Sequence, residues 1–492
     1  MLDGHPKARK VVTLLSGVSI ALSAGTNYAF SIYSVQLGQK LHLSSTALNV
    51  IGLGGNLGMY ISSPMVGRVI DRHGCTVPLL AAGLLISMGY GLLWLLYLQP
   101  TLPLIVVQTF LGNLFAGLGS SIANSCAVTG TASVFEATHR ATAIGTVLAG
   151  FGLSAFFWTT IGSHIAKSDT AVLLALLSIG PPLANLLGGL GYFLAGLKHH
   201  HVNRDSVYHS DSHGEQDPQP SLSSSSSNHS LRQGAGEATQ LLLLRGKTQV
   251  VDITGWELAK EWDFWMICMV MSCCCGIGLM IINNLGTMLV ALNGAGPADE
   301  TVRQYQAHAV SVLSLFNCFG RVFAGTISDQ LKRGLSVGRV WWLSWISCLF
   351  LLSQLVGYYV VESMDQVVWL AALVGFSYGN MYGTGPALIL EWFGLGHFGT
   401  NFGLLNLAPL VCGQLFNLSF GRIFDSHSHH HGSADQGLVC EERQGCYASA
   451  FLITICGAIL SLLVSIWLAF RRPEFSLVET DDRETEPFII EQ

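Results

Sequence analysis

The stretch Gly67-Arg-Val-Ile-Asp71-Arg72-His-Gly74 returns later in the chain in a weaker form, as Gly325-Thr-Ile-Ser-Asp329. The two stretches lie 258 residues apart, and further residues match at the same offset. These matches are Gly117 with Gly375, Phe135 with Phe393, His139 with His397 and Gly145 with Gly403. A single offset that links several loops predicts two parallel repeats of one unit. In membrane transporters of this design, the solute binds between the repeats near the midplane.

The composition around these stretches is typical of a membrane protein. Only 11% of the residues are Asp, Glu, Lys or Arg, against about 25% in soluble proteins, and the mean hydropathy is +0.48. These values exclude a soluble enzyme, a secreted disulfide scaffold and a disordered protein. A net charge of -6 without a basic patch gives no indication of nucleic-acid binding. The 12 cysteines lie mostly in apolar runs, where they are expected to be small buried side chains.

Twelve apolar segments are long enough to cross about 30 Å of hydrocarbon as helices. They are apolar on all sides, which excludes the alternating strands of a membrane barrel. We therefore predict an all-α membrane protein with twelve transmembrane helices in two pseudo-symmetric six-helix bundles. The expected starts are Val11, Thr46, Val77, Leu102, Ala141, Ala171, Phe264, Tyr305, Val337, Gln366, Phe398 and Cys446.

Lysine and arginine residues are unequally divided between the two sets of loops, and this division predicts the orientation. One side holds Arg68, Arg72, Arg140, Lys332, Arg333 and Arg339, and the tails on that side add Lys7, Arg9, Lys10, Arg471, Arg472 and Arg483. The other side holds Lys40, Lys167, Arg303 and Arg443. We predict that both termini are cytosolic.

A polar segment separates the sixth span from the seventh. Residues 198–260 are rich in Ser and His, so we expect a disordered cytosolic loop. The predicted units are a cytosolic tail (1–10), a six-helix bundle (11–197), the loop (198–260), a second six-helix bundle (261–470) and an acidic cytosolic tail (471–492).

The Gly67–Gly74 stretch, between the second and third spans, resembles the signature of the major facilitator superfamily, and Gly325–Asp329 lies where that family repeats it. The resemblance covers nearly all of the chain outside the loop and tails. It implies a secondary transporter whose signature closes a cytoplasmic latch in the outward-open state. The glycine lets helices approach closely, and the aspartate meets an arginine or a helix N-terminus. The latch residues would be Gly67, Asp71, Arg72, Arg140, Gly325 and Asp329. The alternative is a helix-end charge pair that only fixes topology.

Two other stretches indicate a branch of that superfamily. Tyr28-Ala29-Phe30 looks like part of the first helix of monocarboxylate porters and their nodulin-like relatives. Arg140-Ala-Thr-Ala-Ile-Gly145, followed by Ala149-Gly150, is similar to the fifth-helix motif of that group. The chain most resembles the fungal monocarboxylate-transporter homologues of the vacuolar membrane.

The chain also departs from true monocarboxylate porters. Those proteins carry a lysine shortly after the first-helix aromatic, where this chain has Ile32, and an aspartate four residues before the eighth-helix arginine, where it has Asn317. Their charged motif before the first helix is missing. The resemblance therefore implies the fold of a monocarboxylate porter, but it does not imply that the transported solute is a lactate-type acid.

Arg321 is the clearest candidate for the solute site, because a charge inside a span is costly and usually functional. It lies eight residues before Asp329, about 12 Å deeper along a helix, with Asn317 on the same face. Its guanidinium could clamp a carboxylate or phosphate through two parallel hydrogen bonds. The alternative is a structural arginine that pairs within the protein or reaches the cytosolic interface.

Polar side chains also gather in the first, fourth, seventh and tenth spans, which line the cavity in this superfamily. The substrate-binding candidates besides Arg321 and Asn317 are Asn27, Tyr28, Asn124, Asn283, Asn284, Tyr378, Asn380 and Tyr382. The same spans carry Ser31, Tyr33, Asn113, Ser120 and Ser121. Each of these could instead bond a neighbouring helix.

Groups that could couple transport to protons are few. Glu391 and Glu136 lie at cytosolic helix ends, where they are expected to serve the gate, and Asp263 and Glu261 lie at the start of the seventh span. The protein is either a uniporter, or the group that couples transport to protons lies at the end of a helix.

The predicted non-cytosolic loop before the last span holds the histidines His427, His429, His430 and His431 and the cysteines Cys440 and Cys446. The histidines either form part of a flexible polar loop or bind metal or sense an acidic lumen; we predict no metal site. Cys440 and Cys446 could form a short disulfide, since this face is oxidising or luminal.

Glu237-Ala-Thr-Gln-Leu241-Leu242 in the central loop resembles an acidic dileucine sorting signal, unless it is a chance match in a biased segment. We expect a vacuolar, lysosome-like membrane, with the plasma membrane second. The expected partners are a small-molecule solute, the lipid bilayer and adaptor proteins, with no nucleic acid.

The sequence contains neither a P-loop nor H-E-x-x-H nor a nucleophile elbow, so we predict no enzyme activity and no cofactor. We predict a secondary active or facilitative transporter of a small organic solute, with an organic anion favoured, that works by alternating access. A nutrient sensor on the same fold is the alternative, although it would more often carry a structured tail. A channel lacks support, because no ring of like charges or filter motif occurs.

Overall fold

The computed structural model describes residues 5–30, 33, 37, 40–41, 45–99, 104–166, 169–197, 252–293, 300–335, 338–427 and 442–472. Within these ranges the protein consists of helices and connections, without a strand.

Each half of the chain forms six long helical segments in the described residues. The first half has α1 (Pro6–Ala24, continued by η1, Gly25–Ala29), α3 (Ser45–His73), α4 (Thr76–Leu98), α5 (Ile105–Ala132), α6 (Ala137–Ala166) and α7 (Thr170–Leu194). The second half has α11 (Trp262–Asn293), α12 (Glu300–Leu335), α13 (Arg339–Tyr359), α14 (Met364–Phe393), α15 (Phe398–Leu405) continued by α16 (Ala408–His427), and α17 (Ala448–Arg471). The short helices α10 (Trp256–Lys260) and η2 (Arg443–Cys446) precede α11 and α17.

Ten of these segments are long and apolar enough to cross a membrane, counting the described residues alone. The two others, α3 and α14, are equally long, but the described residues of neither contain an 18-residue window as apolar as those of the ten. Each of the twelve expected starts lies within five residues of an observed helix start. The predicted all-α fold with twelve membrane helices is therefore confirmed.

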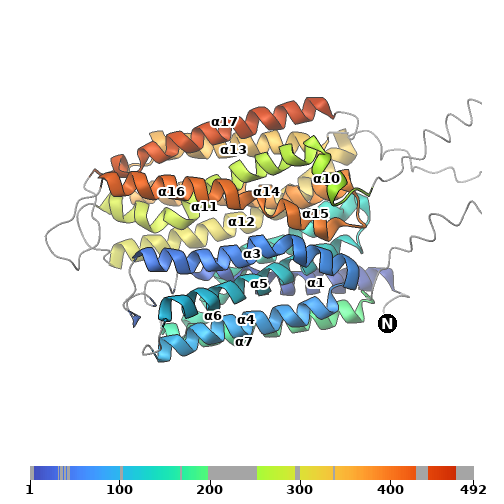
Figure 1. Ribbon diagram of the computed structural model, residues 1–492. Coiled ribbons are helices and arrows are strands. Elements are labelled where there is room, and N and C mark those ends of the chain that lie inside the picture. The colour runs from blue at the N-terminus through green and yellow to red at the C-terminus, as the bar shows by residue number, and fades with distance from the viewer. Residues whose placement is uncertain are drawn as a thin grey trace, which may run out of the picture.

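The two halves form two bundles that lie side by side (Figure 1). The same helix pairs pack in both: α3 on α5 corresponds to α12 on α14, and α4 on α7 corresponds to α13 on α17. The outer helices expose large apolar side chains, among them Leu84, Leu187, Trp345 and Leu463. Such side chains suit hydrocarbon, because helices satisfy their own backbone and present apolar surface to lipid.

Helix α1 begins and α17 ends at the same end of the molecule, on the right in Figure 1. We call this the latch end. Helices α3 and α12 end there, and α6 and α15 begin there. That the latch end faces the cytosol stays a prediction from the lysine and arginine distribution.

Candidate solute site and the latches between the halves

Asp71 lies near the end of α3 and meets the first turn of α15 in the other half. Its carboxylate accepts hydrogen bonds from the amides of Gly399 and Thr400, at 2.9 and 2.7 Å, and from Oγ1 of Thr400 at 2.6 Å. The first amides of a helix lack partners within it and carry partial positive charge, which a carboxylate satisfies. One turn earlier, a Cβ on Gly67 would collide with the carbonyl oxygen of Gly399. These contacts join α3 to α15.

Asp329 makes the equivalent contact between α12 and α6. Its Oδ2 accepts hydrogen bonds from the amide of Thr142 at 2.8 Å and from Oγ1 of Thr142 at 2.7 Å. A Cβ on Gly325 would lie 2.5 Å from the carbonyl oxygen of Ala141. Thr142 and Thr400 are also 258 residues apart, so the repeat offset was the signal that could have predicted both threonines. We call the pairs Asp71–Thr400 and Asp329–Thr142 the two latches.

The predicted latch arginines lie beside these contacts. Arg72 is exposed, and Nε of Arg140 donates to the carbonyl oxygen of Phe135 at 2.9 Å. Nearby on the surface, Lys10 donates to Glu136 at 2.7 Å and holds the pKa of that carboxyl below its usual value.

A buried charge cluster supports the second latch. Arg339 of α13 pairs with Asp329 and, at 2.7 Å, with Glu391 of α14. Lys332 pairs with the same glutamate at 2.6 Å. Glu391 therefore serves the latch region and is held by two cations.

Arg321 lies two turns deeper than Asp329 on α12 and is fully buried. Its Nε donates to Oδ1 of Asn317 at 3.0 Å, and its Nη1 donates to the carbonyl oxygen of Leu148 on α6 at 2.8 Å. The guanidinium carbon lies 5.2 Å from the ring centroid of Phe151 and 5.1 Å from that of Tyr382. Its Nη2 has no hydrogen-bond partner, and no acidic side chain among the described residues pairs with Arg321.

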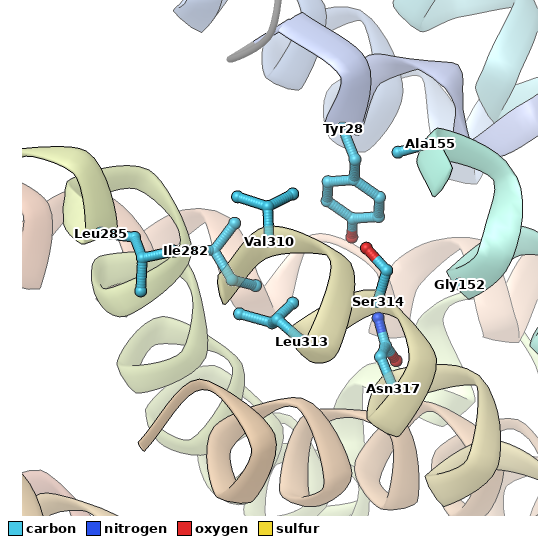
Figure 2. Close-up of a pocket in the computed structure, with 9 residues that line it drawn as sticks. All are labelled: Tyr28, Gly152, Ala155, Ile282, Leu285, Val310, Leu313, Ser314 and Asn317. Carbon is cyan, nitrogen blue, oxygen red and sulfur yellow. The ribbon is translucent and has the colours of Figure 1, made fainter. Parts of the chain in front are cut away.

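A small pocket beside Arg321 lies between the halves and has a cavity volume of about 30 Å³. Its lining residues are Tyr28, Gly152, Ala155, Ile282, Leu285, Val310, Leu313, Ser314 and Asn317. Figure 2 shows the hydroxyl of Tyr28 pointing from the first half toward Ser314 of the second. An apolar wall with a few polar side chains is typical of sites for small organic molecules.

Tyrosines connect this pocket to the arginine. The hydroxyls of Tyr28 and Tyr378 are 3.4 Å apart across the halves, and the ring centroids of Tyr378 and Tyr382 are 5.0 Å apart. Tyr28 also packs edge-on against Phe151, at 5.6 Å. The structure thus brings five sequence-predicted residues together: Tyr28, Asn317, Arg321, Tyr378 and Tyr382.

Most of the other predicted candidates make contacts within one half. The side-chain amides of Asn27 and Asn380 donate to backbone carbonyl oxygens, at 3.4 and 2.8 Å. Asn283 and Asn284 both donate to Oδ1 of Asn417 on α16, at 3.3 and 3.0 Å. The amides of Asn27, Asn283 and Asn284 thus join neighbouring helices, as intramembrane amides often do, whereas that of Asn380 bonds within α14. The remaining candidate, Asn124, has a buried Oδ1 that finds no hydrogen-bond partner among the residues the structure describes.

Sequence reasoning missed three residues of the site. Phe151 and Gly152 follow directly after the Ala149-Gly150 motif of the fifth span, so that motif was the available signal. A Cβ on Gly152 would lie 3.4 Å from Nε of Arg321, which makes this glycine part of the wall around the guanidinium. Ser314 lies three residues before Asn317, on the same face of α12.

Several predicted features fall partly or wholly outside the described residues. Cys446 is disulfide-bonded, but Cys440 lies outside these residues, so the pairing of the two stays a prediction. The same holds for His429, His430 and His431 and for the sorting signal with Glu237, Leu241 and Leu242. The described part of the chain contains no group of three His, Cys, Asp or Glu residues that could hold a metal ion.

Comparison with known proteins agrees with this geometry. Residues 14–408 match the family model of the Major Facilitator Superfamily. The probable transporter MCH1 of Gibberella zeae is 24% identical, over 94% of this chain and 90% of that protein. The protein NUCLEAR FUSION DEFECTIVE 4 of Arabidopsis thaliana is also 24% identical, over 96% of this chain and 90% of its own length.

Solved structures with the same fold include two symporters. The fucose:proton symporter FucP of E. coli has a TM-score of 0.56 at 13% identity, over 93% of this chain and 98% of that one. The proton:xylose symporter XylE has a TM-score of 0.59 at 13% identity, over 96% of both chains. Identities this low show the fold alone. The family match, the repeated latch and the paired six-helix bundles together identify the chain as a multi-pass membrane protein of the Major Facilitator Superfamily, similar to the MCH1-type probable transporters and their nodulin-like relatives.

Proposed function

We propose that this protein moves a small organic anion across its membrane by alternating access, with Arg321 as the anion-binding group. The observation that supports this most is a fully buried guanidinium for which the described residues supply no acidic partner and no hydrogen-bond partner of Nη2. A lone buried charge is unfavourable, and a bound carboxylate would complete its hydrogen bonds. The rings of Phe151 and Tyr382 also contact the guanidinium and restrict its movement, which favours binding of a carboxylate through two hydrogen bonds.

The pocket suggests what the rest of the anion looks like. Ile282, Leu285, Val310 and Leu313 form an apolar wall next to Asn317, the hydrogen-bonding neighbour of Arg321. A small organic anion with a short carbon body fits this combination better than an inorganic ion, whose surface is polar on every side.

Arg321 also links cargo binding to movement. Its Nη1 donates to Leu148 across the halves, at the same interface that the Asp329–Thr142 latch closes. Opening the latch end separates α12 from α6 and breaks both contacts. An anion on the guanidinium replaces Leu148 as its partner, and a charge-assisted hydrogen bond contributes about 1.5–3 kcal/mol. The bound anion therefore lowers the free energy needed to open the latch end.

The structure favours facilitated transport over proton coupling. None of the residues that line the pocket is a carboxylate or a histidine. Two other acidic residues, beside the start of α11, are candidates for proton coupling from the sequence. Asp263 pairs with Arg471 and Arg472, and Glu261 pairs with Arg472, all at the latch end. Uptake into vesicles should accordingly be the same with and without a pH gradient, and a clear dependence on the gradient would restore the coupled mechanism.

The subcellular location and the orientation in the membrane are proposed from the sequence. We propose that the latch end and both termini lie in the cytosol, because the loops on that side are rich in lysine and arginine. The Glu237–Leu242 segment favours the vacuolar or lysosome-like membrane through adaptor proteins. Replacing Leu241 and Leu242 by alanine should move the protein to the cell surface, as seen by microscopy of a tagged chain; an unchanged location would eliminate the motif.

The decisive test of the proposed function uses purified protein in lipid vesicles with labelled organic anions. Arg321→Gln should nearly abolish anion uptake and spare neutral solutes, because it removes the charge. Arg321→Lys keeps the charge but not the two-pronged geometry, so it should raise the apparent substrate constant. Arg422→Gln, at an exposed arginine of α16, is the matched control. Normal anion uptake by Arg321→Gln would show that the arginine is structural.

A further inference from the structure

Residues 252–255, which we call the strap, lead into α10 and lie against the start of α15 at the latch end (Figure 1). Oδ1 of Asp252 accepts a hydrogen bond from the amide of His397 at 3.3 Å, and Oδ2 lies 3.0 Å from Nδ1 of the same histidine. Two glycines leave room for this carboxylate. A Cβ on Gly396 would collide with Oδ2, and a Cβ on Gly394 would lie 2.8 Å from Oδ1. The connection between α14 and α15 is therefore shaped to hold the side chain of Asp252.

The backbone of the strap binds both sides of the same connection. The amide of Ile253 donates to the carbonyl oxygen of Phe393, the last residue of α14, at 3.2 Å. The carbonyl oxygen of Ile253 accepts a hydrogen bond from Nδ2 of Asn401, in the first turn of α15, at 2.8 Å. The strap thus holds the first turn of α15 in a fixed position relative to the end of α14.

That first turn of α15 is the part of the helix that the latch at Asp71 uses. The amides of Gly399 and Thr400 donate to Asp71, and the amide of His397, just before them, donates to Asp252. Amides at a helix start lack partners within the helix, and here two carboxylates from distant parts of the chain supply them. A shift of this turn would move the amides that Asp71 binds, so Asp252 acts on the latch through the position of the turn.

The other latch is supported in a different way. The amide of His139, the repeat counterpart of His397, donates to a backbone oxygen three residues earlier, at 3.1 Å. Asp329 pairs instead with Arg339, and the two side chains are 0% and 6% exposed. The side chains of Asp252 and His397 are 34% and 32% exposed. A contact that is partly open to water is broken at low cost, so the strap can be released while the bundle stays folded.

We propose that Asp252 is a positioning residue that keeps the Asp71–Thr400 latch closed, and that release of the strap favours opening of the latch end. The strap gives the chain that joins the two halves direct control over one latch, while buried charges set the other. This inference rests on the alternating access of the proposed function, but it does not use the anion site.

Two variants release the strap in different ways. Asp252→Ala removes the carboxylate, and Gly396→Ala places a methyl group where Oδ2 of Asp252 lies, so it expels the same carboxylate. When the two are combined, Gly396→Ala should add no further effect, because the group that it displaces is already gone. Gly334→Ala is the matched control, since a Cβ there would meet no described atom within 4 Å.

The first measurement is hydrogen exchange at the amides of Gly399 and Thr400, in the purified full chain in lipid vesicles. Asp252→Ala and Gly396→Ala should each speed this exchange by roughly three- to tenfold, the effect of about one net hydrogen bond. The amide of Thr142, in the other latch, should exchange as in the parent. Unchanged exchange at Gly399 and Thr400 would overturn the proposal, and so would an equal rise at Thr142, which would indicate general loosening.

The second measurement, vesicle uptake, shows whether the strap acts through Asp71. Asp252→Ala should slow uptake by about threefold in the parent, but by less than about 1.5-fold in Asp71→Asn, whose latch is already weakened. Losses that multiply would make the strap a structural element that is independent of the latch. Normal anion uptake by Arg321→Gln would end the anion proposal, while exchange at the latch amides would still decide the strap.

Discussion

The α3–α15 interface and the α6–α12 interface make equivalent contacts at the latch end. Asp71 binds Thr400 in one, and Asp329 binds Thr142 in the other, through an amide and a hydroxyl each time. Eight residues deeper the two interfaces differ. The first has Ser63, which accepts a hydrogen bond of 3.1 Å from Asn406, where the second has Arg321, which donates to Leu148.

Under the proposed mechanism, this comparison separates the parts that would move from the part that would bind the solute. Ser63 and Arg321 are repeat counterparts, as are Asn406 and Leu148, so the same crossing of helices carries different chemistry on its two sides. In the proposed alternating-access cycle, the latches open and close on both sides of the pseudo-two-fold axis, which accounts for their symmetry. A single anion-binding arginine, by contrast, is sufficient on one side of that axis.

Among the substitutions that test this comparison, Asp329→Asn is expected to cause the largest loss of stability and transport. The side chain of Asp329 is fully buried with Arg339, whereas no lysine or arginine in the described part of the chain forms an ion pair with Asp71. Removing one partner of a buried ion pair costs about 3 kcal/mol or more, because the remaining charge stays buried. The variant should unfold at a clearly lower temperature in detergent and lose most of its transport. Stability equal to that of the parent would show that Glu391 alone suffices for Arg339.

A smaller effect is expected from Asp71→Asn. The substitution keeps the size of the side chain and its acceptor oxygen but weakens three charge-assisted hydrogen bonds to Gly399 and Thr400. Stability should fall by about 1 kcal/mol, while vesicle uptake falls several-fold because the closed latch end is less favoured. Equal uptake by variant and parent would reduce this motif to a marker of topology.

The sequence predicted the latch aspartates better than their partners. Asp71 and Asp329 stand in a recognisable stretch, but Thr142 and Thr400 become visible only when the repeat offset is applied to them. For the solute site, Arg321 was predictable because charge is rare in a span. Asn283 and Asn284 were equally conspicuous, yet they bond Asn417, because an amide in a helix finds a partner on whichever neighbour is nearest.

The smallest effect is expected from Ser63→Ala, which alters the counterpart of Arg321. The change removes one neutral hydrogen bond and leaves the amide of Asn406 without its acceptor, a loss of about 1 kcal/mol in stability. Anion uptake should stay within about twofold of the parent, because no charge is lost and both latches remain. Ser465→Ala, at a buried serine of α17 that bonds within its own helix, controls for the loss of a buried hydroxyl. If Ser63→Ala reduced uptake as strongly as Arg321→Gln, both interfaces would contact the cargo directly, and the division between a symmetric latch and a one-sided anion site would be wrong.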